Sequence, residues 1–214
     1  MLWDPRNKSR NEAAAPAAAL ADAGQLFPTK ALRKFLGSLI NRDTPVLMDL
    51  GPVVGSNLNF FGEHLGCKIL LEDLFGDLDR HPYDPEKPFA AFLKQRFRQE
   101  PQSVDGILCW NIFDFLDPAA AQTLASELKR MLRPDGALLA FFATSSVPNT
   151  RFFKYVIVDE DSLKQKPYSS PGKRQNALPN RDIIRMFEGL KVAESFLLKN
   201  NVREFLFRKP ASAD

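Results

Sequence analysis

The stretch Pro45-Val46-Leu47-Met48-Asp49-Leu50-Gly51-Pro52-Val53-Val54-Gly55-Ser56-Asn57 decides the fold of this chain. Its first residues are mostly apolar and end on an acid and a glycine, which predicts a short buried strand running into a tight turn. Apolar residues then follow at helical spacing as far as Leu65, behind a helix cap at Ser56 or Asn57. The order strand, glycine turn, helix places the turn at the carboxyl end of a parallel strand, where ligands bind.

The glycine pattern differs from the two commonest nucleotide-binding loops. From Gly51 it reads Gly-Pro-Val-Val-Gly, without the second glycine of a dinucleotide fingerprint or the Gly-Lys-Ser/Thr of a phosphate loop. It resembles the first motif of the class I S-adenosylmethionine-dependent methyltransferases, an acid-x-Gly-x-Gly-x-Gly turn after the first strand. Asp49, Gly51 and Gly55 match that motif, whereas Val53 replaces its middle glycine and adds bulk where the family's backbone lies against the cofactor.

Two acids follow the second strand, which we predict within residues 66–75. An acid about twenty residues past a glycine turn is well placed to accept hydrogen bonds from both hydroxyls of a ribose. The resemblance implies this role for Glu72 by its spacing, with Asp73 as the near competitor. The alternative is that both acids only cap the segment that follows.

Residues 76–103 depart from the family, which has its third strand in this region. A polar loop is followed by apolar residues at helical spacing: Phe89, Phe92, Leu93 and Phe97. We therefore expect the third strand to be very short or missing.

The segment 104–118 resembles the family's fourth strand and the loop after it. The resemblance implies that Cys109, Trp110 and Asn111 contact the methionine part of the cofactor. An amide such as Asn111 can orient a nucleophile but cannot act as a base, and Asp114 is the nearest carboxylate that could. Asn111 and Asp114 are therefore the candidate catalytic residues. For Trp110, a core aromatic is the alternative role.

The carboxyl-terminal half matches the end of the family's fold. A helix over 119–131 leads into Leu132-Arg133-Pro134-Asp135-Gly136, a predicted turn with a positive φ at Gly136, and then into a buried fifth strand. A short helix capped by Asn180 and an antiparallel hairpin over 191–209 follow. The predicted fold is an α/β, mostly parallel, seven-stranded Rossmann-like methyltransferase sheet with helices on both faces and an antiparallel carboxyl-terminal strand.

We predict an Ala-rich amino-terminal arm over residues 1–28 and, from the resemblance, one methyltransferase-like domain over 29–214. Residues 143–179 are polar and rich in Pro and Ser, which indicates an inserted lid or substrate-binding segment, with a plain surface loop as the alternative. Its candidate contacts are Arg151, Lys154, Tyr155 and Tyr168.

Apolar runs, cysteine spacing and net charge limit the classes of function that this chain can have. No apolar run is long enough to span a bilayer, no signal-peptide pattern starts the chain, and the two cysteines have no metal spacing, so we expect a cytoplasmic protein without a metal. A net charge of +3 does not by itself indicate nucleic acid, which stays open as a substrate, as does the oligomeric state. We expect S-adenosylmethionine as the cofactor and a small-molecule acceptor. The alternatives are an inactive, methyltransferase-like scaffold and, with less support, a nucleotide-dependent oxidoreductase.

Overall fold

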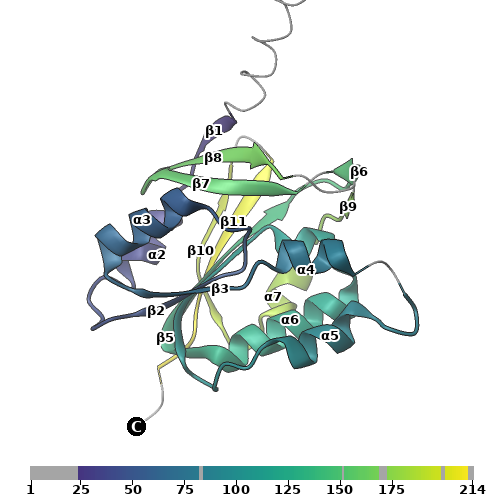
Figure 1. The fold of residues 1–214 in the computed structure, drawn as a ribbon, viewed down its shortest axis with the longest axis horizontal. Coiled ribbons are helices and arrows are strands. Elements are labelled where there is room, and N and C mark those ends of the chain that lie inside the picture. The colour runs from purple at the N-terminus through teal and green to yellow at the C-terminus, as the bar shows by residue number, and fades with distance from the viewer. Residues whose placement is uncertain (1–23, 82–83, 151, 169–172, 199–200, 212–214) are drawn as a thin grey trace, which may run out of the picture.

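The computed structural model describes residues 24–81, 84–150, 152–168, 173–198 and 201–211, and a six-stranded sheet forms its centre (Figure 1). The strand order is β10-β11-β5-β4-β2-β3. Neighbours among β2, β3, β4 and β5 run parallel, whereas β11 is antiparallel to both β5 and β10. The bounds are β2 (Val46–Asp49), β3 (Lys68–Leu71), β4 (Val104–Trp110), β5 (Leu132–Ala143), β10 (Lys191–Leu197) and β11 (Val202–Arg208).

Two hydrophobic clusters lie on the two faces of this sheet. One contains buried residues of α2 and α3, and the other contains buried residues of α4, α5, α6 and α7 (Figure 1). All seven residues of β4 are buried, as expected for a central strand covered on both sides. The helices are α2 (Leu32–Gly37), α3 (Gly55–Leu65), α4 (Leu74–Arg80), α5 (Phe89–Arg96), α6 (Pro118–Met131) and α7 (Asn180–Met186), with a 3-10 turn η2 (Ile112–Phe115) after β4.

The α/β class, the mostly parallel sheet and the antiparallel carboxyl-terminal hairpin are confirmed, but the seventh strand is not found in the described residues. Between β3 and β4 the chain forms α4 and α5 instead. The reason is the helical period of this segment, which buries Leu93 and Phe97 in the core, whereas a strand would alternate them with polar neighbours.

A second, smaller sheet is built mainly by the predicted insertion. Its order is β1-β8-β7, with β1 (Gln25–Pro28), β7 (Phe153–Asp159) and β8 (Ser162–Pro167), and all its pairs are antiparallel. A separate pair joins β6 (Val147–Thr150) to β9 (Lys173–Gln175). The insertion is therefore largely β-structure, and the last residues of the predicted arm add one strand to it. Residues 1–23 and Arg151 lie outside the described residues.

The start of α3 differs from the predicted cap. Val54 occupies the N-cap position and makes no side-chain hydrogen bond to the helix. Asn57 instead is buried and clamps β7, because its Nδ2 donates to the carbonyl of Tyr155 and its Oδ1 accepts from the N–H of Ile157, both at 2.8 Å. The small sheet is thereby fixed to the helix that follows the glycine turn. The cap of α7 also differs from the prediction, because Pro179 and not Asn180 occupies its N-cap position.

The predicted positive φ in the 132–136 turn falls one residue earlier. Asp135 has a φ of 57°, and Gly136 does not have a positive value. Glycine is required at position 136 for space, because a Cβ there would lie 2.7 Å from the carbonyl oxygen of Arg133.

Candidate functional site

The strand order reverses at β2, which has β4 on one side and β3 on the other. In open α/β sheets, ligands bind at the carboxyl ends of the strands at this switch point. Asp49 ends β2 and Trp110 ends β4, and the Trp110 Nε1–H donates to Asp49 Oδ1 at 2.6 Å. The N–H of Gly51 donates to the same oxygen at 2.8 Å.

The Asp49 carboxyl group is buried, and burial raises its pKa to about 6. The two N–H donors from Gly51 and Trp110 oppose that rise because they stabilise the charged form, and the charge of Asp73 adds to it. A buried carboxyl with a raised pKa at a ligand-binding edge is a common feature of functional sites.

Trp110 covers the first half of the glycine turn. A Cβ at Gly51 would lie 2.6 Å from the indole Cδ1 and Nε1, so glycine is required there for packing. The indole also stacks on Tyr155 of β7, with ring centroids 5.1 Å apart and planes inclined by only 3°. The second half of the turn is open, because a Cβ at Gly55 would meet nothing within 4 Å and Val53 is 49% exposed.

The structure separates the two acids that follow β3. Glu72 faces α5, where its carboxylate accepts hydrogen bonds from Arg96 Nη1 at 2.6 Å and from Gln99 Nε2 at 2.5 Å. Asp73 is half-buried, adopts a φ of 29°, and accepts a hydrogen bond from the N–H of Gly76 at 3.0 Å as the N-cap of α4.

The second candidate site is a cavity of about 360 Å³ between the large and small sheets. Asn111 lines it, is 5% exposed, and its Oδ1 has no hydrogen-bond partner. Asp114 lines it too, and both of its carboxylate oxygens lie 3.1 Å from the N–H of Ala143, which ties η2 to the end of β5. The two candidate catalytic residues are thus brought together. Tyr155, whose pKa burial raises far above its ordinary value, forms part of the wall.

The remaining sequence-predicted residues lie apart from this cavity. The Cys109 side chain is fully buried in the core, and burial raises the pKa of its thiol well above the ordinary value. Lys154 Nζ lies over the ring of Tyr168, 5.0 Å from its centroid. Among the described residues no group of three His, Cys, Asp or Glu side chains could hold a metal ion.

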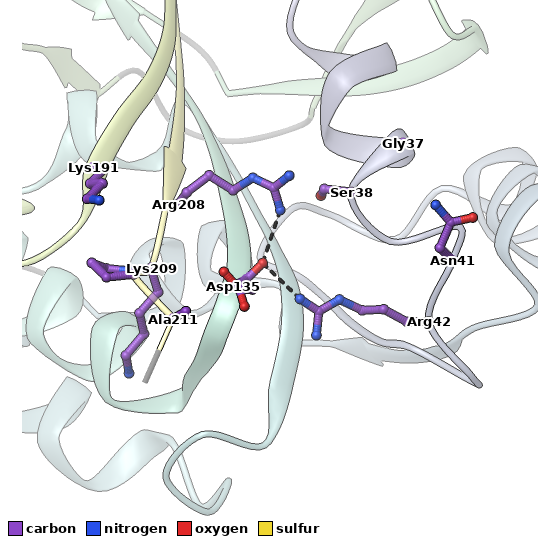
Figure 2. Close-up of a pocket in the computed structure, with 10 residues that line it drawn as sticks. Gly37, Ser38, Asn41, Arg42, Asp135, Lys191, Arg208, Lys209 and Ala211 are labelled. Carbon is purple, nitrogen blue, oxygen red and sulfur yellow. Dashed lines mark hydrogen bonds between the residues drawn. The ribbon is translucent and has the colours of Figure 1, made fainter. Parts of the chain in front are cut away.

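A basic hollow of about 620 Å³ lies at the opposite edge of the sheet, where β5 begins and β11 ends (Figure 2). Figure 2 shows the guanidinium groups of Arg42 and Arg208 pointing at the Asp135 carbonyl oxygen, at 2.8 and 3.0 Å. Arg42 also pairs with the buried Asp105, as does Arg133. These cations bind the first residues of β5, so we assign the hollow a structural role.

Sequence reasoning missed the two contacts that join the small sheet to the residues at the switch point. The Asn57 clamp on β7 has no sequence signal, because an Asn at a helix start is ordinarily a cap. Tyr155 was a candidate contact of the insertion, but its stacking on Trp110 joins residues 45 positions apart and follows only from the fold.

No protein-family profile and no curated protein matches the chain. Solved structures do match. A S-adenosylmethionine-dependent methyltransferase from Methanosarcina mazei is 11% identical with a TM-score of 0.50, over 81% of this chain and 96% of that one. The Burkholderia thailandensis 1,6-didemethyltoxoflavin-N1-methyltransferase, solved with 1,6-didemethyltoxoflavin and S-adenosylhomocysteine, is 15% identical with a TM-score of 0.49, over 92% and 82%. The glycopeptide N-methyltransferase MtfA, solved with S-adenosylhomocysteine, is 13% identical with a TM-score of 0.47, over 84% and 86%.

The strand order, the antiparallel hairpin and the Methanosarcina mazei structure agree on the fold. The chain has the fold of the class I S-adenosylmethionine-dependent methyltransferases. Such a likeness identifies the fold and leaves the reaction to be argued from the site. In the part of the chain that the structure describes, no helix has the length and apolar character to cross a membrane.

Proposed function

We propose that this chain is a S-adenosylmethionine-dependent methyltransferase with a small-molecule acceptor. The observation that carries the proposal is the pair of acids at the switch point: Asp49 ends β2, and Asp73 follows the end of the neighbouring parallel strand β3 as the N-cap of α4. A half-buried carboxylate at the tip of the strand beside a glycine turn suits the hydroxyl groups of a ribose.

The nucleoside end of the cofactor fits the residues present. Asp73 is the better ribose ligand, because both carboxylate oxygens of Glu72 already accept hydrogen bonds from residues near the end of α5. The open backbone at Gly55 and the exposed Val53 leave room beside α3. If the methionine end passes Gly51, as the motif of the family implies, the Trp110 indole would have to move away from Gly51 to admit it.

S-adenosylmethionine supplies a methyl group on an already activated sulfonium, so the protein mainly has to align donor and acceptor. In this chain, Asp73 would hold the ribose and the turn from Gly51 to Gly55 would approach the cofactor with its backbone. Asn111 would orient the acceptor from the cavity wall. Asp114, in the same wall, would act as the base if the acceptor must lose a proton.

Calorimetric titration with S-adenosylmethionine and S-adenosylhomocysteine tests this proposal. We expect binding by the wild type, a loss of tenfold or more in Asp73→Asn, and little change in the matched variant Glu72→Gln. Thermal unfolding of each variant controls for folding. A well-folded wild type that binds neither ligand refutes the proposal, and a loss confined to Glu72→Gln refutes the assignment of the ribose to Asp73.

One observation favours the inactive scaffold as a second candidate. The Trp110 indole occupies the space over Gly51, and Val53 stands where the family has glycine. If neither the wild type nor Trp110→Ala binds the cofactor while both stay folded, the scaffold function replaces the enzyme.

The proposal also covers the class of methyl acceptor and the cellular location. The cavity beside Asn111 holds about 360 Å³ and has mixed polar and aromatic walls without a Lys or Arg among the described lining residues, which suits a small molecule better than nucleic acid. Nucleic-acid binding would instead fall steeply with added salt. A cytoplasmic location remains a prediction.

A further inference from the structure

The Trp110 indole occupies the space beside the first half of the glycine turn. A Cβ at Gly51 would lie 2.6 Å from the indole Cδ1 and Nε1, so a group that approached the Gly51 backbone from this side would meet the ring. At Gly55 a Cβ would meet nothing within 4 Å. A ligand of an open α/β sheet is expected at this switch point. Half of the expected ligand position is therefore filled by a side chain of the protein itself.

The backbone that carries this indole has an unusual conformation. Trp110 has a φ of 49°, in the left-handed region that bulky side chains seldom adopt. The pairing of β4 with β5 also shifts its register here, because Leu108 pairs with Leu139 but Trp110 pairs with Ala140. Irregular pairing next to a site commonly redirects a side chain, and a strained backbone persists only where its surroundings hold it. The contacts of the indole therefore keep it in a position that its backbone disfavours.

Two contacts hold the indole, and they come from different sheets. Its Nε1–H donates to Asp49 Oδ1 at 2.6 Å, at the end of β2 in the large sheet. Its rings stack on Tyr155 of β7, in the small sheet. Asn57 fastens β7 beside α3 (Figure 1). The stack can thus be weakened from the small sheet without any change in the glycine turn.

We propose that the Trp110 indole is an autoinhibitory group, which competes with S-adenosylmethionine for the space beside Gly51 and is held there by Tyr155. The cofactor would bind only those molecules whose indole has left the turn, so its apparent affinity falls in proportion to their fraction. A movement of the small sheet that withdraws Tyr155 would raise this fraction. The small sheet would thereby control access to the cofactor site. This competition rests on the proposed function, because S-adenosylmethionine is the ligand of that function.

Calorimetric titration of the full chain with S-adenosylhomocysteine tests the competition. Tyr155→Leu should bind about three- to tenfold more tightly than the wild type, because the loss of one aromatic stack raises the fraction of open molecules by about that factor. Trp110→Ala should bind at least as tightly as Tyr155→Leu. Unchanged or weaker binding by the folded variants overturns the inference, because the ring pair would then be indifferent to the cofactor or would support it.

Leu163→Ala is the matched control. Leu163 is buried in β8, so its truncation loosens the small sheet but keeps the stack of Tyr155 on Trp110. Its affinity for S-adenosylhomocysteine should stay within twofold of the wild type. Tightening by Leu163→Ala equal to that by Tyr155→Leu would overturn the role of Tyr155. Thermal unfolding establishes that each variant is folded.

The fluorescence of Trp110 tests the movement without a change in the site. The chain has two tryptophans, Trp3 and Trp110, so Trp3→Phe leaves Trp110 as the only one. The indole is buried in the free chain, with 3% exposure of the residue. Saturating S-adenosylhomocysteine should shift its emission and raise its quenching by acrylamide at least twofold. Cofactor binding that changes neither signal overturns the inference.

The inference and the proposed function fail separately. Binding by the wild type that depends on Asp73, with no change at Trp110 and no tightening in Tyr155→Leu, removes the inference and keeps the proposed function. Binding by Trp110→Ala and Tyr155→Leu but not by the wild type supports the inference and removes the proposed function from the unmodified chain. Absence of binding by all three folded proteins removes both.

Discussion

Replacing Asp49 by Asn should stabilise the folded chain at neutral pH and have little effect in acid. Burial raises the pKa of this carboxyl group to about 6 from an ordinary value of 3.8. At 1.36 kcal/mol per pH unit, the difference corresponds to about 3 kcal/mol. The Asn variant avoids this term, because it carries no charge and its Oδ1 can still accept from Gly51 and Trp110.

The sign follows from proton binding. Below pH 3.8 the Asp49 carboxyl is protonated in both the folded and the unfolded chain. As the pH rises toward 6, the unfolded chain releases this proton first, so the folded chain binds more protons and the stability of the wild type falls. Above pH 6 the folded chain also releases the proton, so it no longer gains stability from the protonated Asp49 and carries a buried charge instead.

Urea denaturation of the wild type and Asp49→Asn at pH values of about 4.5 and 7.5 measures this effect. Integrated over that interval, the advantage of the variant in the free energy of unfolding should grow by about 2 kcal/mol. Asp43→Asn is the control, because Asp43 is exposed and its replacement should change stability by less than about 0.5 kcal/mol at either pH. An Asp49→Asn difference that stays constant with pH would refute the reasoning.

Three further predictions concern contacts around the switch point. Trp110→Phe keeps a ring but removes the N–H that donates to the buried Asp49. It should lower the free energy of unfolding, measured in urea, by roughly 1.5–3 kcal/mol. It should also raise the pKa of Asp49, which the pH dependence of the free energy of unfolding reports. Asn57→Ala leaves the Tyr155 carbonyl and the Ile157 N–H unpaired, so amide hydrogen exchange in β7 should accelerate and stability fall by about 2–3 kcal/mol, whereas unchanged exchange would contradict the clamp. Glu204 accepts hydrogen bonds from two backbone N–H groups at the start of α2, at 2.9 and 3.1 Å. Glu204→Ala removes this acceptor and should lower the free energy of unfolding by roughly 1–3 kcal/mol. Glu204→Gln keeps an acceptor oxygen, so it should retain most of the wild-type stability.

The central strand–turn–helix unit was predictable from sequence because its signals are local. Apolar runs, an acid and a glycine within a few residues set β2, the turn and α3, and the same kind of pattern set β4, α6, β5 and the final hairpin. The lack of the family's third strand among the described residues also had a local signal, the helical period around Leu93, but the family pattern favoured a seven-stranded sheet. Where residue pattern and resemblance disagreed, the pattern predicted the structure.

The roles of adjacent acids were beyond reach of the sequence. Glu72 and Asp73 both follow a buried strand, and successive side chains point in different directions. Which one stays available depends on Arg96, 24 residues further on, whose guanidinium also pairs with Asp77. Contacts of this kind form only when helices and strands have assembled, so no pattern within a short window contains them.

The two glycines of the motif, Gly51 and Gly55, have different surroundings. At Gly51 a side chain is excluded by the chain itself, since the indole of Trp110 fills the space that a Cβ would enter. At Gly55 the space is open, and Val53, which replaces the middle glycine, points largely into solvent. A glycine required by a ligand and one required by packing look the same in sequence. The match to the motif therefore supports the fold more strongly than the cofactor, and Asp73, which we propose as the ribose ligand, is the sharper test of function.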